Sequence, residues 1–440
     1  MRDLAIAFLI FAWVPAILMV PYLGVYAWSW ISYMNPHQLG YDYIRTWPVA
    51  EIVGIATLVA WLFSKEPKKL PFHFLIVMTI IILIWTSITT YYAFDPTLSA
   101  IKWDRSSKIL LFTLVTCGLI TTKNRLIGLV WIIVLSLGFY GIKGGAFTLA
   151  TGGQYHVWGP ENSFIDDNNA LAMALVMTVP LMRFLQLQTP VAWIKWALGG
   201  SIVITIFAIF GTQSRGALLA IIAMLIVLVL KSRRKAFGLM ASVLAIAVAL
   251  VFMPKTWTDR MMTIETYDED SSAVGRLEMW NFAIKIANDN PLLGGGYTVF
   301  ASPIAQQKYL PTAVKAREPH SIYFEQLGEH GYTGLIIFLT ILVGAFYYGG
   351  RTIRMTKDDP SLTWARDLAS MVQVSLVGYA VAGSFLTLAT FDLYWHMVAM
   401  VAITDMLVVR ELAKKKAPAE QQNEVVSTTA QLGQKARFTV

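Results

Sequence analysis

The sequence contains few charged residues, few histidines and a single cysteine. Only 14% of its 440 residues are charged, whereas a soluble globular domain carries about 25%. This scarcity of charge, together with a hydrophobic share of 56%, excludes an ordinary soluble domain. Because Cys117 is the single cysteine, an intramolecular disulfide is impossible, and the sequence does not reveal the redox compartment.

Long apolar runs occupy most of the chain. Segments of roughly 20 apolar residues, the length needed to cross a bilayer, recur as far as about residue 410. A transmembrane barrel would instead show alternating segments of about 10 residues. The sequence therefore predicts an all-α, polytopic helical bundle of about 12 transmembrane helices. The expected crossings are 4–33, 48–63, 71–94, 106–121, 126–141, 169–187, 193–211, 216–230, 236–253, 332–349, 367–387 and 391–410.

Four regions follow from this pattern. Nine transmembrane helices fill residues 1–253, a long polar connection covers 254–331, and three further transmembrane helices fill 332–410. Residues 411–440 lack apolar periodicity and are expected to be disordered in the cytoplasm. A connection as long as 254–331 with structure of its own is usually functional.

The first apolar region and the positive charges set the expected topology. Pro15 and Pro21 interrupt 4–33, which we interpret as one kinked crossing with an interfacial half-helix. Lys and Arg residues concentrate in alternate connections, which the positive-inside rule assigns to the cytoplasm. Both termini are then cytoplasmic, whereas a thirteenth crossing would place the N-terminus outside. The net charge of +8 lies mostly in these connections and does not require a nucleic-acid partner.

The long connection 254–331 faces outward in this topology and contains one clear helical pattern. Either Ser271 or Ser272 can cap the helix, and Asn290 with the proline after it ends it. Apolar residues recur at helical spacing at Leu277, Trp280, Ile284 and Ala287. We expect a short amphipathic helix that lies on the membrane surface.

Two arginines lie at the expected outer ends of helices. Arg215 follows the turn "GTQS" and begins an apolar run, and Arg276 begins the amphipathic helix. A helix N-terminus adds free N–H donors and a positive dipole end, which together favour an anion. Two guanidinium groups on one membrane face suit a diphosphate, because each can bond phosphate oxygens bidentately. The alternatives are a snorkelling anchor for Arg215 and a solvated helix residue for Arg276.

The acidic and glycine-rich segments give no clear sign of a metal or nucleotide site. The segment "YDEDSS" at 267–272 resembles a solvated turn, and "FIDDNN" at 164–169 precedes an apolar run, where Asp and Asn cap helices. Binding of a divalent ion is the alternative for each. The segment "LLGGGYTVF" at 292–300 lacks a Walker lysine, which leaves a backbone turn or a close approach to a substrate. We expect neither a metal nor a cofactor.

Two of the six histidines flank the start of a late apolar run. His320 follows a proline at the mouth of the expected membrane cavity, where an imidazole can remove a proton from a hydroxyl near neutral pH. A structural histidine that holds the loop is the alternative. Glu325 or Glu329 could orient His320, and the spacing does not decide between them. His330 precedes two glycines and is interpreted as structural, at a helix end or hinge.

The segments that carry these residues resemble a known family. "GTQSRGALLA", "GRLEMWNFAIKIANDNPLLGGGY" and "PHSIYFEQLGEHGYTGL" are similar to the O-antigen ligase and polymerase superfamily of bacterial inner membranes. "WISYMNPHQLGY", "TIETYDEDSSAVGRLEMW" and the glycine-rich segment 138–169 resemble its exosortase A-associated O-glycosylation ligase branch. The resemblance covers roughly residues 1–410.

The resemblance implies a metal-independent, inverting glycosyltransferase at the periplasmic face of the inner membrane. It would move a glycan en bloc from undecaprenyl diphosphate to a hydroxyl of a lipid or protein acceptor, among membrane lipids. Arg215 and Arg276 match the family arginines that bind the diphosphate, and His320 matches the histidine proposed as the base. Lys143 and Tyr297 are further candidates for supporting roles.

Two alternatives remain open at this stage. A polymerase, in which donor and acceptor are both polyprenyl-linked chains, shares the same motifs. A lipid-linked glycan flippase or another transporter would want ionisable residues deep inside spans. The spans are largely free of such residues, and Asp392, His396 and Asp405 are exceptions near the last one.

Overall fold

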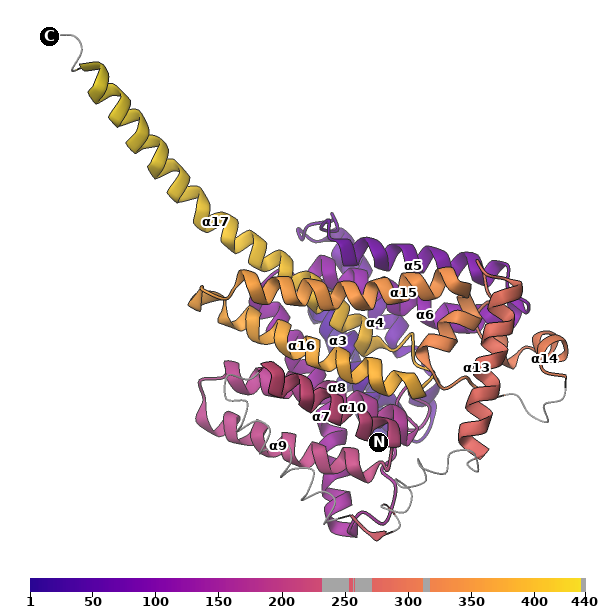
Figure 1. Cartoon of the computed structure of the whole chain (residues 1–440). Coiled ribbons are helices and arrows are strands. Elements are labelled where there is room, and N and C mark those ends of the chain that lie inside the picture. The colour runs from indigo at the N-terminus through magenta and orange to yellow at the C-terminus, as the bar shows by residue number, and fades with distance from the viewer. Residues whose placement is uncertain (232–252, 256, 258–270, 312–316, 437–440) are drawn as a thin grey trace.

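The computed structural model is built from helices (Figure 1). It describes residues 1–231, 253–255, 257, 271–311 and 317–436, and these contain no strand. The helices are α1 (Arg2–Phe11), α2 (Trp13–Met19), α3 (Tyr22–Met34), α4 (Val49–Phe63), α5 (Phe74–Tyr91), α6 (Pro96–Leu119), α7 (Lys123–Thr151), α8 (Asn168–Gln188), α9 (Ala192–Gly211), α10 (Arg215–Lys231), α13 (Ser271–Asp289), α14 (Pro303–Tyr309), α15 (Ile322–Met355), α16 (Thr363–Ala382) and α17 (Asp392–Ala436). Short 3-10 helices are η1 (Pro36–Leu39), η2 (Tyr43–Thr46), η4 (Val299–Ala301), η5 (Pro360–Leu362) and η6 (Gly383–Phe385).

The described residues include eight helical segments that are long and apolar enough to cross a membrane. They correspond to α1 with α2, α5, α7, α8, α9, α15, α16 with its flanking 3-10 turns, and α17. This confirms a polytopic helical membrane protein. The expected number of about 12 is not established, because α4 and α10 are shorter, α6 carries charges, and 236–253 lies outside the described residues.

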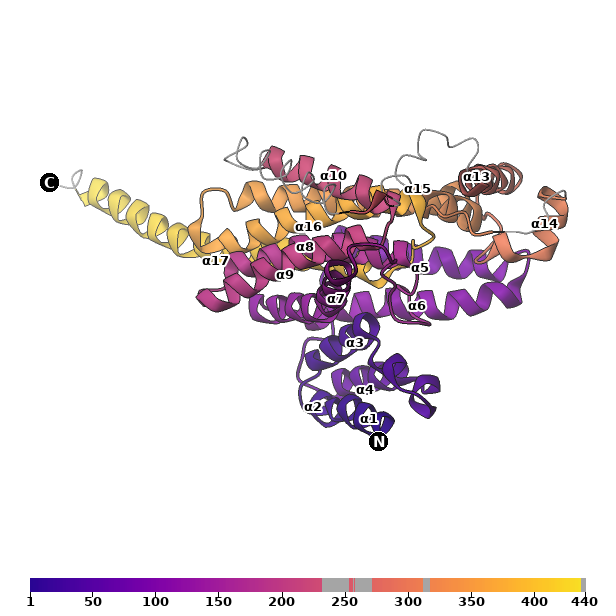
Figure 2. The same cartoon turned by 90° about the horizontal axis from the view of Figure 1, so that it is seen from below.

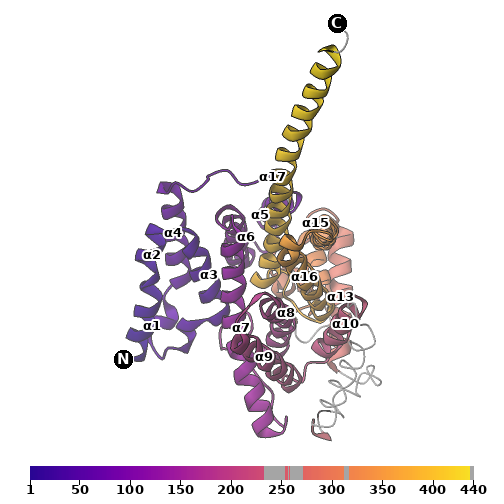
Figure 3. The same ribbon diagram turned by 90° about the vertical axis from the view of Figure 1, so that its left-hand side faces the viewer.

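The N-terminal region folds as a helical hairpin, with α1 and α2 followed by α3, where we expected a single kinked crossing. α3 begins directly after Pro21, and the chain then returns toward its start. The carboxylate of Asp3 accepts hydrogen bonds from the backbone N–H groups of Tyr41 (2.9 Å) and Asp42 (2.8 Å), which closes the hairpin. The N-terminus therefore lies beside the connection 35–48. Figures 2 and 3 show α1 to α4 grouped at one side of the bundle.

The centre of the bundle is formed by α8 and α17. In their apolar segments, 83% and 89% of the residues are buried. Small and weakly polar side chains allow close packing there. The Ser375 hydroxyl of α16, for example, donates to the Met177 carbonyl of α8 at 2.7 Å. A hydroxyl that donates to a helix carbonyl has a hydrogen-bond partner without water. Polar groups inside a bilayer must find such partners within the protein.

Several helices are longer than the apolar runs that predicted them. α6 begins at Pro96 because Asp95 caps it, accepting a hydrogen bond from the Leu98 N–H at 3.1 Å. Lys102, expected in a connection, therefore lies within α6. α7 continues to Thr151, so Lys143 is an exposed helical residue.

The expected helix is confirmed as α13 (Ser271–Asp289), and it packs on the rest of the protein through residues that the sequence pattern did not single out. Leu277 and Ile284 are exposed. The side chains that pack against α14, η4 and Phe324 are instead Met279, Phe282, Ala283 and Ile286. α13 lies at the end of the bundle (Figure 1), where contacts with other helices, including α15, hold it in place.

The C-terminal segment also differs from our expectation. α17 continues as a helix to Ala436 and projects away from the bundle (Figure 1). The segment 411–436, expected to be disordered, is therefore helical in the structure.

One buried ionic cluster joins parts of the chain that are far apart in sequence. The Lys102 ammonium on α6 lies 2.8 Å from Glu325 Oε1 and 2.8 Å from Glu329 Oε1, both on α15. The Lys102 side chain is 20% exposed and the two carboxylates at most 2%. Glu325 Oε2 accepts from the Ala389 N–H and Glu329 Oε1 from the Thr298 N–H, each at 2.9 Å. We call this set the Lys102 cluster.

We predict that Lys102→Met destabilises the protein strongly. It would leave two buried carboxylates without their cation, and breaking a buried pair costs about 3–5 kcal/mol. The measurement is the thermal unfolding midpoint of the full-length protein in detergent. Lys108→Met is the matched control, because its partners Glu51 and Asp104 are about half exposed and exposed pairs contribute about 0–1 kcal/mol. Equal midpoints for the two variants would contradict the prediction.

Candidate functional site

His320 has an unusual backbone conformation that the surrounding structure holds in place. Its φ angle is +44°, in the left-handed region that L-residues other than glycine rarely adopt. Its backbone N–H donates to the Thr387 hydroxyl at 3.0 Å. The side chain is half-buried. The loop before α15 therefore fixes the backbone position from which the imidazole extends. The imidazole lies partly exposed at the surface of the bundle.

α13 packs directly along this loop. The Trp280 indole N–H donates to the Pro319 carbonyl at 2.8 Å, and its ring stacks on Phe324 with centroids 4.8 Å apart. Arg276 lies one helical turn before Trp280 and therefore shares its face of α13. The pKa of His320 is lowered, first by burial and second by the positive charge of Arg276. The sequence-predicted pair of Arg276 and His320 is thus brought together.

Arg215 approaches the same place from another helix. It is the first residue of α10, and the next residue, Gly216, packs against Phe385 of η6: a Cβ atom there would lie 3.3 Å from the Phe385 ring. Phe385 is two residues from Thr387, which accepts the hydrogen bond from His320. Arg215 and the His320 backbone are therefore both positioned by the short segment 383–387.

The segment 152–168 packs on the turn that precedes Arg215. The Asn168 side-chain amide donates to the Thr212 carbonyl at 2.7 Å, and the Gln213 amide donates to the Gly153 carbonyl at 3.2 Å. Asp167 caps α8 by accepting from the N–H groups of Asn169 and Ala170. This capping role agrees with the interpretation of "FIDDNN" as a helix start. Asp167 also raises the pKa of His320 against the larger lowering effects, so it lies within electrostatic reach of the imidazole.

Among the described residues, no group of three or more His, Cys, Asp and Glu side chains is placed to hold a metal ion. Most of the other acidic segment, 267–270, lies outside the described residues. The site described so far consists of one guanidinium group at the start of α10, one in the second turn of α13, and one imidazole with a lowered pKa. Chemically, it can bind an anion and accept a proton.

The two glutamates expected as partners of His320 are engaged elsewhere. Both carboxylates belong to the Lys102 cluster and bond the backbone at Ala389 and Thr298. Their role in the structure is to fix the first turns of α15 and the segments beside it. Lys102 was missed at the sequence level. Two glutamates four residues apart lie on the same face of a helix, and if that face is buried they need a cation nearby. This spacing was the feature of the sequence that could have indicated a partner such as Lys102.

His330 has the structural role expected of it. It is fully buried, its Nδ1 lies 2.7 Å from the Thr89 hydroxyl oxygen, and its carbonyl accepts from the Trp85 indole N–H at 3.3 Å. The next residue, Gly331, has φ +68° and ψ −172° and interrupts α15. The predicted hinge is therefore present as a kink.

The glycine-rich segment 292–300 makes its close approach to the protein's own backbone. The N–H groups of Gly295 and Gly296 donate to the Gly328 and Glu329 carbonyls at 2.9 and 2.8 Å. A Cβ atom on Gly294 would lie 2.4 Å from the Gly331 nitrogen, so no other residue fits there. This segment is a backbone turn that docks on the kink of α15.

The two remaining supporting candidates differ in their surroundings. Tyr297 is buried against the His330 ring, with centroids 4.4 Å apart and perpendicular planes. Burial and the nearby Glu329 raise its pKa to about 12. Lys143 is exposed on α7 and makes no hydrogen bond or ion pair with another described residue. Tyr297 thus supports the packing of α15, whereas nothing in the structure joins Lys143 to the His320 loop.

Comparison with known proteins adds independent findings. Residues 200–339 match the O-Antigen ligase family (Wzy_C), and residues 1–189 match a family of unknown function (DUF5935). The chain is also similar to the exopolysaccharide production protein ExoQ of Rhizobium meliloti (strain 1021), with 25% identity over 191 residues. That alignment covers 40% of this chain and 41% of the relative, which is less than half of each.

The matched segment 200–339 contains Arg215, Arg276, His320 and the kink of α15. The residues that the fold gathers around segment 383–387 therefore come mostly from the part of the chain that the ligase family shares. These matches support a relationship to the O-antigen ligase and polymerase superfamily.

Proposed function

We propose that the protein is a glycan ligase of the bacterial inner membrane. It transfers a glycan en bloc from undecaprenyl diphosphate to the hydroxyl of a lipid or protein acceptor at the periplasmic face, without a metal. The proposal is supported by the effect of the Arg276 charge on the pKa of His320 and by the segment 383–387, which contacts both Gly216, the residue after Arg215, and the His320 backbone. The narrower assignment to the exosortase A-associated branch is part of this proposal.

The proposed step follows from the chemistry of the three side chains. Arg215, at the N-terminus of α10, and Arg276, in the second turn of α13, bind the diphosphate. The acceptor oxygen attacks the anomeric carbon from the face opposite the diphosphate, so the configuration inverts. The bond from that carbon to the diphosphate oxygen breaks, and the electron pair leaves with the diphosphate. The acceptor proton moves to the neutral imidazole of His320, while the arginines stabilise the charge that develops on the leaving group.

Polymerisation is the second candidate, because the relative ExoQ bears a name that refers to exopolysaccharide production. In a polymerase the acceptor hydroxyl belongs to a second polyprenyl-linked glycan. The same three side chains would serve both reactions. Ligation gives a single transfer to an acceptor that lacks a polyprenyl chain, whereas polymerisation gives a ladder of lengthening glycans.

A product assay with His320→Ala tests the reaction. Purified protein is reconstituted with a polyprenyl-diphosphate oligosaccharide and candidate acceptors in the presence of a chelator. We expect transfer by the parent protein and a loss of about 10²–10⁴-fold in the variant, the usual contribution of a general base, with donor binding retained. His37→Ala, on the distant η1, is the control. Transfer by His320→Ala at the parent rate would require another base, and loss of activity in the chelator would require a metal.

Arg215→Lys tests bidentate binding of the diphosphate. Lysine keeps the charge but loses the planar fork, and one hydrogen bond to a charged group contributes about 1.5–3 kcal/mol. We expect transfer to slow about ten-fold or more. Arg183→Lys is the control, because Arg183 is exposed on α8 and bonds only Gln186 among the described side chains. A parent-like rate for Arg215→Lys would exclude the fork as the source of binding.

The pH profile tests the pairing of Arg276 with His320. Because the pKa of His320 is lowered, the neutral base persists below the ordinary histidine pKa of about 6.5, and the acid limb of kcat/KM lies below that value. Arg276→Gln removes one cause of the lowering, although Arg317 lowers the pKa as well and Glu318 and Asp167 raise it. We expect the acid limb to move upward by up to about one pH unit.

Lys285→Gln is the matched control for this profile, since Lys285 is an exposed cation on the same helix and does not act on the pKa of His320. An acid limb that stays in place in Arg276→Gln, or moves equally in both variants, would contradict the assigned pair.

A further inference from the structure

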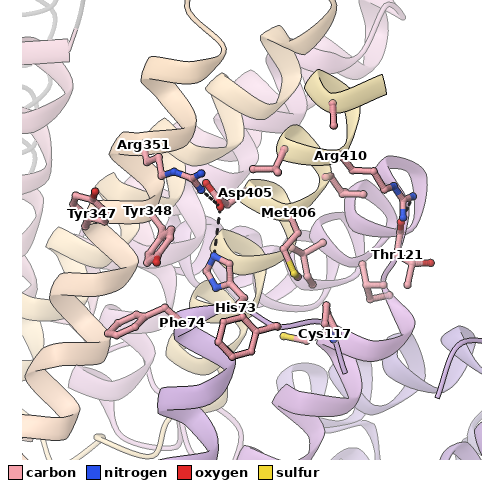
Figure 4. Close-up of a pocket in the computed structure, with 17 residues that line it drawn as sticks. His73, Phe74, Cys117, Thr121, Tyr347, Tyr348, Arg351, Asp405, Met406 and Arg410 are labelled. Atoms are coloured by element: carbon pink, nitrogen blue, oxygen red, sulfur yellow. Dashed lines mark hydrogen bonds and ion pairs between the residues drawn. The ribbon is translucent and has the colours of Figure 1, made fainter. Parts of the chain in front are cut away.

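A large pocket lies at the other end of the bundle, where α5, α6, α15 and α17 meet (Figure 4). Its volume is about 720 Å³, and the polar residues lining it include His73, Thr121, Arg351, Asp405 and Arg410. Arg351 follows Glu325 by 26 residues on α15, which corresponds to about 39 Å along a helix. The pocket is therefore far from His320, and the proposed transfer step does not use it.

The polar groups of this pocket leave an excess of positive charge. Asp405 is 2% exposed and bonds Arg351 Nη1 at 2.5 Å and the Thr352 hydroxyl at 3.2 Å. His73 Nδ1 accepts a hydrogen bond from the Leu75 N–H at 3.2 Å, so its Nε2 carries the proton. That Nε2 lies 3.5 Å from Asp405 Oδ2. Among the residues that line the pocket, one carboxylate faces two guanidinium groups.

Arg410 is the second guanidinium group, and Asp405 is the one carboxylate among the residues that line the pocket; the neighbouring Glu411, which the Arg410 charge also reaches, lies outside the lining and pairs with Lys414. Its Nη2 reaches the Thr121 carbonyl oxygen at 3.5 Å, the long limit for a hydrogen bond. Arg410 and Arg351 line the same pocket, from α17 and α15. Figure 4 shows their side chains on the two sides of Asp405 and Met406. An anion between them would find fork-shaped donors on both sides.

An apolar groove of about 580 Å³ continues from this pocket along the outer face of α15. The two share Phe74, Tyr347 and Tyr348. The groove extends to Val343 and Ile336, which are 66% and 61% exposed on a membrane-spanning helix. From Ile336 to Tyr347 the helix rises about 16 Å, which is enough to accompany much of an acyl chain through one leaflet.

We propose that this pocket and groove bind an anionic phospholipid. The phosphate lies between Arg351 and Arg410, and one acyl chain follows the groove past Tyr347 toward Ile336. Charge complementarity selects an anionic headgroup over a zwitterionic one, because the pocket retains one uncompensated positive charge. The apolar groove selects a lipid over a free phosphate, because only a lipid covers both surfaces at once.

Cys117 makes the proposal directly measurable, because it lines the pocket and is the single cysteine of the chain. The full-length protein in a neutral detergent is treated with methyl methanethiosulfonate, and thiol modification is followed by mass spectrometry. At a phosphatidylglycerol concentration ten times its Kd, about one site in eleven is empty, so modification slows about ten-fold. Phosphatidylcholine and glycerol 3-phosphate leave the rate unchanged.

Each other result overturns the proposal. Equal protection by phosphatidylcholine shows that charge does not select the occupant, and protection by glycerol 3-phosphate alone shows a soluble anion site. If the thiol does not react in the lipid-free protein, native mass spectrometry measures which lipid the protein retains. Equal retention of phosphatidylglycerol and phosphatidylcholine would then refute the proposal.

A matched pair of variants assigns the contact. Arg410→Gln removes a charge-assisted contact and leaves the Arg351–Asp405 pair intact, so phosphatidylglycerol binding weakens about ten-fold. Arg354→Gln removes an exposed arginine of α15 that does not line the pocket and leaves the affinity unchanged. Equal affinities in the two variants contradict the assigned site.

Discussion

The Lys102 cluster is the interaction on which the arrangement of the candidate site depends. Two carboxylates that are at most 2% exposed cannot be held in a membrane protein without a cation and hydrogen bonds, because the cost of their desolvation exceeds what packing returns. One ammonium and two backbone N–H groups meet that requirement. In doing so they tie α6, the start of α15, the glycine-rich segment and the segment around Ala389 into one unit. Thr387, which bonds the His320 backbone, lies two residues from Ala389.

The glycines beside this cluster have a steric explanation. Backbone bonds from segment 292–300 to Gly328 and Glu329 require the two main chains to approach without side chains between them. A Cβ atom on Gly331 would lie 2.6 Å from the Leu292 carbonyl oxygen. Gly331 also has a positive φ, which glycine adopts without strain. The glycine-rich segment is thus a structural dock for the kink of α15, and nucleotide chemistry has no part in it.

Local patterns predicted much of this molecule, and long-range pairings escaped prediction. The position of α13 followed from the serines at its start and the Asn-Pro after its end, and the structural role of His330 followed from the glycines after it. The N-terminal hairpin depends on Asp3 meeting residues 41 and 42, and the Lys102 cluster joins residues 223 and 227 positions apart. Neither leaves a periodic trace in the sequence. The face of α13 that packs on the protein was not predicted, because its apolar residues occupy more than one face and only the neighbouring segments decide which face they cover.

The two ends of α15 are fixed by different buried ion pairs, and the kink between them makes this possible. At one end the Lys102 cluster holds Glu325 and Glu329, and at the other Asp405 of α17 holds Arg351. In a straight helix of this length, one rotation about the helix axis would have to direct the glutamates at one end toward Lys102 and Arg351 at the other end toward Asp405. Gly331 interrupts the helical backbone, so the first nine residues can orient toward α6 while the rest packs on α17. The contacts at the start of α15, before the kink, therefore orient the His320 loop. The long apolar part of α15 after the kink contributes only its position in the bundle.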